Sequence, residues 1–207
     1  MNANLEQARD DLAFMRSLVS GGEHFQATAG EVFMWAGCIY GAQCIGQWLD
    51  IVGVLHLPPL GQLILGLGPT AVFLVYLGVV IWRERKAPKG GPTTRALTAV
   101  FQGAGIANLV LAFVFAYGAH RAQSMTVWLY HPVVVCLFQG VAWYVAWTVR
   151  KRAWVGFVAF GWFAVTLACG LLVYDVAKFI LIIAVALFLL MALPGYAMMR
   201  IARKAEA

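Results

Sequence analysis

The stretch 176–199, VAKFILIIAVALFLLMALPGYAMM, carries no charged residue after Lys178. A transmembrane helix needs about 20 predominantly apolar residues to cross a hydrocarbon core of roughly 30 Å. In lipid, backbone N–H and C=O groups must be satisfied within the protein, and only helices and closed barrels achieve this. The stretch has the length of a spanning helix, so it predicts the fold class: an all-α integral membrane protein.

Five further apolar stretches precede this one. They cover residues 31–55, 60–82, 95–117, 125–149 and 153–174. Together with 176–199 they predict a six-transmembrane-helix bundle over residues 31–199, followed by a basic cytoplasmic tail at 200–207. The segments CIGQWLD (44–50) and CGLLVYD (169–175) share a cysteine and an aspartate at the same spacing. This match suggests three related helical hairpins, an internal repeat of the kind that some membrane proteins contain.

Composition agrees with a membrane protein and excludes other classes. Hydrophobic residues make up 62% of the chain and charged residues 12%, against about 25% charged residues in a soluble domain. A net charge of +6 would suit a nucleic-acid-binding protein if the positive residues formed one continuous patch. Here they stand at the ends of the apolar stretches. We therefore expect a lipid bilayer around the chain and no nucleic acid as partner.

The positive residues also predict the orientation in the membrane. Three basic segments fall on one side of a six-span arrangement, namely the linker 83–95, the turn 150–152 and the tail 200–204. The other side holds Arg121 and Lys178. Cytoplasmic loops carry an excess of lysine and arginine. We therefore expect a multi-pass protein of the plasma (inner) membrane with both termini in the cytoplasm.

Residues 1–22 predict a separate amphipathic cytoplasmic helix, and Gly21-Gly22 is a typical helix end. Its apolar residues recur at spacings of three and four, as in a helix with one narrow apolar stripe. They are Leu5, Ala8, Leu12, Met15 and Val19. One interpretation places this helix against the cytoplasmic face of the bundle or the lipid headgroups. The other is a helix that docks a partner, with Leu5, Leu12, Met15 and Val19 as the docking residues.

Polar residues inside the apolar stretches are the best candidates for a site, because burying them in lipid is costly. In the first stretch Tyr40, Gln43, Gln47 and Asp50 share one helical face, at spacings of three and four. Candidate residues for a ligand or ion pocket in the outer half are Gln43, Gln47, Asp50, His131, Gln139, Asp175 and Lys178. They either wall a cavity open to the outside or bond neighbouring helices together, and we favour the second role.

Motifs for catalysis, metal binding and cofactor binding are missing from the sequence. It contains no G-x-S-x-G, Walker A, H-E-x-x-H or C-x-x-C-H pattern. Its cysteines all fall within apolar stretches and are not spaced as a redox or zinc motif. We therefore expect no catalytic residues, no metal and no cofactor.

Three hypotheses for function follow in order of preference. The first is a non-enzymatic membrane component, a subunit or sensor that acts through helix–helix contacts, with a membrane protein or a second copy as partner. The segments outside the membrane are too short for a catalytic domain, which supports it. The second is a small-solute or ion transporter or channel that uses the polar outer half of the bundle. The third is an intramembrane enzyme, although no paired carboxylates or nucleophile–base set is visible.

Overall fold

The computed structural model describes residues 2–86 and 91–206, with side chains described for residues 26–86 and 91–204. Most of the described residues are helical and none of them lies in a strand, so the all-α class is confirmed. The helices are α1 (Asn2–Ile51), α2 (Pro59–Glu84), α3 (Pro92–Ala122), α4 (Met125–Arg150), α5 (Ala153–Leu171), α6 (Val176–Leu187) and α7 (Leu193–Glu206), with a π-helical segment η1 (Phe188–Ala192) between the last two.

Within the described residues, five helical segments are long and apolar enough to cross a membrane: α2, α3, α4, α5 and the continuous run Val176–Lys204. Each of the five corresponds to one predicted stretch, with starts and ends that differ by up to five residues. The predicted first span, 31–55, is not among them, so the count of six spans is not confirmed. Its polar residues, including Gln43, Gln47 and Asp50, lower the mean hydropathy of that part of α1.

The N-terminal helix does not end where the sequence predicted. α1 runs without a break from Asn2 to Ile51, through Gly21 and Gly22, so the prediction of a helix end there is wrong. A helical glycine costs only about 1 kcal/mol relative to alanine, and neighbouring turns on both sides can outweigh that cost. The docking residues Leu5, Leu12, Met15 and Val19 lie outside the residues with described side chains.

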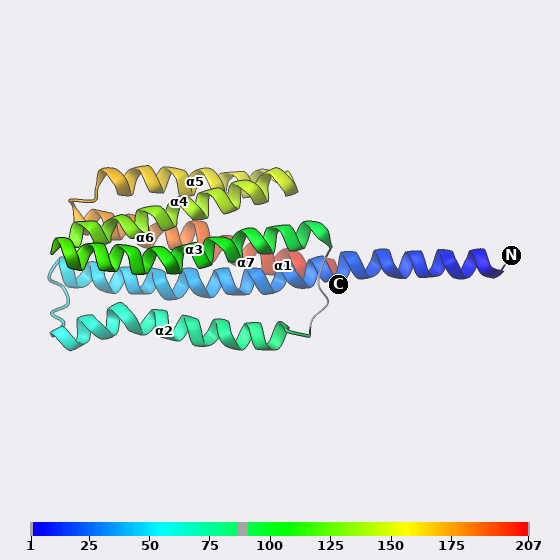
Figure 1. The fold of residues 1–207 in the computed structure, drawn as a ribbon, viewed down its shortest axis with the longest axis horizontal. Coiled ribbons are helices and arrows are strands. Elements are labelled where there is room, and N and C mark those ends of the chain that lie inside the picture. Colours follow the sequence, from blue (N-terminus) through cyan, green and yellow to red (C-terminus); the bar gives the residue numbers. More distant parts are fainter. Residues whose placement is uncertain (1, 87–90, 207) are drawn as a thin grey trace.

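α1 is therefore both part of the bundle and an extension from it. Its 50 residues give a length of about 75 Å at about 1.5 Å per residue. Figure 1 shows the N-terminal part as a straight continuation that leaves the bundle beyond the end of every other helix. We call residues 2–25 the arm. The arm does not fold back over the bundle.

The bundle is built around α1 and α4. α1 packs against α7, α6, η1 and α2, while α4 packs against α3 and α5. The core between them contains Trp143, Val155, Trp162 and other buried apolar side chains. α2 and α3 lie at the outside and expose most of their apolar surface, as expected for helices that face lipid.

Glycines bring α1 and the last span into backbone contact. A Cβ built on Gly30 would lie 2.6 Å from the carbonyl oxygen of Gly195, and one on Gly37 would lie 2.7 Å from the carbonyl oxygen of Leu187. Real side chains do not tolerate such distances to backbone atoms. Small residues at a helix–helix contact allow this close approach in membrane proteins, and here they let the whole last span, from α6 through η1 to α7, pack directly on α1.

The π-helical segment η1 stands next to a proline. Pro194 has no N–H, so the carbonyl of Leu190 cannot accept the usual helical hydrogen bond from it. The indole N–H of Trp162 in α5 donates to this carbonyl instead, at 3.2 Å. A single π turn interrupts the regular register at this point. The irregular backbone is therefore satisfied from a neighbouring helix.

Basic linkers and both ends of the chain lie at one end of the bundle. Figure 1 shows the end of α2, the start of α3, the turn between α4 and α5, and the C-terminus on the side from which the arm extends. The turn after α4 uses Lys151 in the left-handed conformation, with φ of 50°. This arrangement agrees with the one-sided distribution of charge that the sequence predicts.

Candidate functional site

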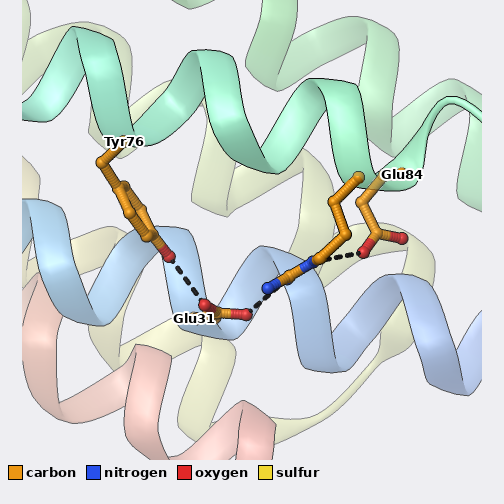
Figure 2. A network of polar contacts seen from close by, with 4 residues as sticks. Glu31, Tyr76 and Glu84 are labelled. Carbon is orange, nitrogen blue, oxygen red and sulfur yellow. Dashed lines mark hydrogen bonds and ion pairs between the residues drawn. The ribbon is translucent and has the colours of Figure 1, made fainter.

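The largest set of polar contacts in the described structure joins α1 to α2. At the basic end, Glu31 of α1 accepts hydrogen bonds from the Tyr76 hydroxyl at 3.0 Å and from Arg83 Nη2 at 2.7 Å. Arg83 Nε also donates to Glu84 Oε1 at 3.1 Å. Figure 2 shows Tyr76 and Glu84 of α2 on the two sides of Glu31. One arginine is therefore shared by two carboxylates from different helices.

In the middle of the α1–α2 interface, a side chain of α1 bonds to a backbone carbonyl of α2 that lies close to a proline. Gln43 Nε2 donates to the carbonyl oxygen of Gly66 at 3.0 Å, in the turn of α2 that precedes Pro69. One turn away, the rings of Tyr40 and Phe73 meet edge to face at 5.4 Å. Gln43, a predicted pocket residue, thus bonds two helices together.

At the opposite end, Asp50 organises the connection from α1 to α2. Its Oδ1 accepts from the backbone N–H of Leu57 at 3.0 Å, and its Oδ2 accepts from Gln62 Nε2 at 3.0 Å. Gln47 lies between these contacts and is half-buried, and its side chain makes no hydrogen bond to any described residue. The polar face predicted on the first stretch is therefore the surface on which α2 rests.

His131 belongs to a second group, between α3 and α4. Its Nε2 lies 3.4 Å from the carbonyl oxygen of Asn108 in α3, and its ring stacks on Trp128 at 5.1 Å. Farther along α4, Gln139 Oε1 and Trp143 Nε1 are buried without a hydrogen-bond partner among the described residues, as is Asn108 Oδ1. Buried polar atoms without partners are rare in proteins, so these three atoms are exceptions within α3 and α4.

Asp175 and Lys178 form a third group at the start of α6. Their side chains make an ion pair of 2.8 Å, and Asp175 Oδ1 also accepts from the backbone N–H of Lys178 at 3.2 Å. These bonds to the charged carboxylate lower the pKa of Asp175. Both side chains are exposed to a large extent, so the pair acts as a surface helix cap.

The predicted pocket residues thus separate into three groups. Gln43 and Asp50 hold α2, His131 holds α3, and Asp175 pairs with Lys178. Among the described residues, no hydrogen bond or ion pair links one group to another. The structure does not bring them together around one ligand, and a role in ligand binding stays a prediction.

Two polar contacts were missed from the sequence. Glu31 was assigned to the boundary of the first span, although it is the centre of the α1–α2 contact. Arg150 Nη1 donates to Gln26 Oε1 at 2.7 Å, and Gln26 Nε2 donates to the carbonyl oxygen of Met198 at 3.5 Å. In a hairpin of two antiparallel helices, residue 31 lies at the same level as the basic end of the next helix. The sequence therefore contained a signal from which the Glu31 contact could have been predicted.

An apolar groove of about 400 Å³ lies between α5 and the last span. Its walls carry no polar side chain, so it suits an acyl chain better than a polar solute. The residues that line it are Gly161, Val165, Leu181, Ile182, Val185, Ala186, Leu189 and Leu190. In the part of the chain that the structure describes, no three histidine, cysteine or acidic residues lie close enough together to hold a metal ion.

Comparison with known protein families, with curated proteins and with solved structures found no match to this chain.

Proposed function

We propose that the chain is a non-enzymatic integral membrane component that acts through helix–helix contacts, as a subunit or a sensor. The observation that carries this proposal is the continuity of α1. One helix is packed against four elements of the bundle and then continues beyond it as the arm (Figure 1). Such a helix mechanically connects a membrane-embedded body to whatever meets the arm outside the membrane.

The polar contacts of α1 support the same role. Glu31, Gln43 and Asp50 are each bonded to α2 or to the connection before it. A transport pathway would need such groups to face a water-filled route. Here they are used for packing, which is a common role of polar residues between membrane helices.

The proposed orientation has six crossings, with residues 31–51 of α1 as the first and both termini in the cytoplasm of the plasma (inner) membrane. The basic linkers at one end support it. Single cysteines at positions 89 and 121 test it by labelling with an impermeant thiol reagent. We expect labelling at 121 from outside intact cells and at 89 only after the membrane is opened. Labelling of both positions from the same side would contradict the topology.

The mass of the particle that the chain forms in a mild detergent tests the functional proposal. We expect the full chain, extracted from its own membranes, to run in an assembly heavier than one chain plus its detergent and lipid, as measured by native mass spectrometry. A chain that is monomeric under all extraction conditions would overturn the proposal.

The second candidate is a small-solute or ion transporter. The unpartnered buried oxygens of Asn108 and Gln139 favour it, because polar atoms at a helix interface can bind a solute or water. Purified chain in liposomes, loaded with a pH-sensitive dye or a labelled solute, tests this alternative. Flux that Gln139→Leu abolishes, while the bundle stays folded, would make transport the better interpretation. We expect no flux, and we expect Asp50→Asn to cost only about 0.6 kcal/mol of stability.

A further inference from the structure

One exposed polar side chain lies within the apolar part of α3. Gln102 is exposed, and its side chain makes no hydrogen bond to any described residue. It stands seven residues past Arg95, about 10 Å into the span at about 1.5 Å per residue. Polar side chains of other spans are bonded within the chain, as Gln62 is to Asp50 and Thr166 is to the backbone of its own helix. A polar group in hydrocarbon is costly without a hydrogen-bond partner, so a partner at this position would stabilise the span.

Gln102 borders an apolar face of α3 that lies opposite the bundle. Leu97 and Phe101, which pack into the core, are on the other side of the helix. At about 100° per residue, Gln102 and the apolar face together fall within about 100° of the helix circumference. We call this face the α3 face. It consists of exposed residues at alternating steps of four and three, namely Ala99, Gly103, Ile106, Val110, Phe113 and Tyr117.

The first two residues of the α3 face leave room for a second helix backbone. Ala99 and Gly103 stand four residues apart, the spacing of small residues that allows close helix–helix approach in membranes. A Cβ built on Gly103 meets nothing within 4 Å, so no described part of this chain uses the space. Gln102 therefore stands beside the point where a second backbone could come closest.

We propose that the α3 face is the contact of a parallel homodimer, in which Gln102 of each copy bonds to Gln102 of the other. This inference rests on the proposed function and names a second copy as the partner. Copies that share one topology lie parallel, so a two-fold axis along the membrane normal brings the same patch of both copies together. An amide has a donor nitrogen and an acceptor oxygen. Two opposed glutamines are therefore complementary in their partial charges, and each satisfies the other.

Other neighbours complement Gln102 less well. Acyl chains offer it no hydrogen bond, and lipid headgroups lie about two helical turns away, near the level of Arg95. A different protein would have to supply a polar group at the same depth, whereas a second copy already carries one. The charged residues Arg95 and Arg121 fall beyond the two ends of the α3 face. Water and salt at the membrane surface screen their repulsion from the same residues of a second copy.

Disulfide crosslinking of the full chain, in intact membranes of the cells that express it, tests the dimer. Ile106→Cys puts a thiol on the α3 face. Gly105→Cys is the matched control, because position 105 is also exposed but lies about 120° from the centre of the face. The native chain, whose four cysteines lie in other helices, gives the background. After oxidation with copper phenanthroline, we expect an adduct of twice the chain mass from position 106 and none above background from position 105.

Leucine substitutions, made in the Ile106→Cys chain, separate loss of the contact from loss of the fold. Gly103→Leu fills the space that the second backbone needs, whereas Gly105→Leu adds the same side chain at a position where a Cβ also meets nothing within 4 Å. We expect Gly103→Leu to reduce the adduct about tenfold and Gly105→Leu to leave it unchanged. Gln102→Leu should reduce the adduct about fivefold, and Gln102→Asn, which keeps the amide, should retain most of it.

Several results would overturn the dimer. They are no adduct from position 106, equal adducts from positions 105 and 106, an adduct with a different protein, an adduct that survives Gly103→Leu or Gln102→Leu, or equal losses in Gly103→Leu and Gly105→Leu. The mass measured in mild detergent separates this failure from failure of the proposed function. If the chain runs in a larger assembly but position 106 gives no adduct, the assembly forms through another surface and only the α3 contact is wrong.

Discussion

α1 is held on two sides in different ways. Toward the last span, Gly30 and Gly37 let the two backbones touch. Toward α2, side chains bridge the space, with Glu31, Gln43 and Asp50 each making hydrogen bonds at a different level. Small residues let two helix backbones touch, and polar residues join helices that stand farther apart. The comparison indicates that the contact of α1 with the last span fixes the bundle, while the α1–α2 contact adds a peripheral helix.

The largest expected effect comes from breaking the close contact. Gly37→Ala places a Cβ against the backbone of the last span, and we expect a loss of about 1–3 kcal/mol or more from overpacking. Gly78→Ala in α2 is the matched control, because a Cβ there meets nothing within 4 Å. Helix propensity alone favours alanine at both positions by about 1 kcal/mol. Thermal unfolding in detergent, followed by circular dichroism, measures both, and equal stability of the two variants would contradict the comparison.

A smaller loss of stability is expected from removing the hydrogen bond that Trp162 donates to η1. Trp162 and Trp143 are each 2% exposed, but only the indole N–H of Trp162 has a described acceptor, the carbonyl of Leu190. Replacing either tryptophan by phenylalanine removes a similar volume. Trp162→Phe additionally leaves a carbonyl unpaired, so it should cost about 1–2 kcal/mol more than Trp143→Phe. Unfolding midpoints of the two variants check this difference, and a larger loss in Trp143→Phe would refute it.

The ion pair between α1 and α2 should contribute a still smaller interaction energy to stability. A double-mutant cycle of Glu31→Gln and Arg83→Gln isolates their interaction, whose atoms lie 2.7 Å apart with the arginine side chain 49% exposed. We expect a coupling of about 0.2–1 kcal/mol, as for other exposed ion pairs. Hydrogen exchange should show faster opening of α2 and unchanged protection of α7. A coupling well above this range, or loosening of α7, would show that the two sides are not independent.

The smallest effect concerns the Asp175–Lys178 pair, which touches neither side of α1. Its bonds lower the pKa of Asp175 below its ordinary value of 3.8. The charged carboxylate therefore contributes stability above pH 3.8, and this contribution disappears as the pH falls through the lowered pKa. We expect Asp175→Ala to be slightly less stable than the native chain at pH 7, and the difference to shrink as the pH falls below 3.8. A difference that does not depend on pH would show that the carboxylate charge is not its source.

Apolar length and charge predicted most of the fold. The ends of the later spans follow from apolar runs that stop at charged residues such as Arg150 and Asp175, and these signals are local. The passage of α1 through Gly21 and Gly22 depends on the turns to either side, which a local rule for helix ends ignores. The candidate site was harder, because the spacing of Gln43 and Asp50 shows that they share a face but not which helix rests on it.

Glu31 illustrates what the sequence could not predict about the contacts between helices. A carboxylate at the edge of an apolar run is typical of a span boundary, and the sequence alone does not show that Arg83 and Tyr76 converge on it. That convergence depends on α1 and α2 being antiparallel and in contact, and on the register between them. The sequence predicts that consecutive spans are antiparallel, but only the three-dimensional arrangement supplies the contact and the register.

The length of α1 has a mechanical consequence. A rod that is clamped at one end converts a small rotation at the clamp into a larger displacement at its tip. At about 1.5 Å per residue the arm is about 36 Å long, so a tilt of about 5° at its base moves its first turn by about 3 Å. Gly30 and Gly37 form the fulcrum, because they fix the distance between α1 and the last span. A small tilt of α1 in the bundle therefore moves the tip of the arm by about the diameter of a water molecule.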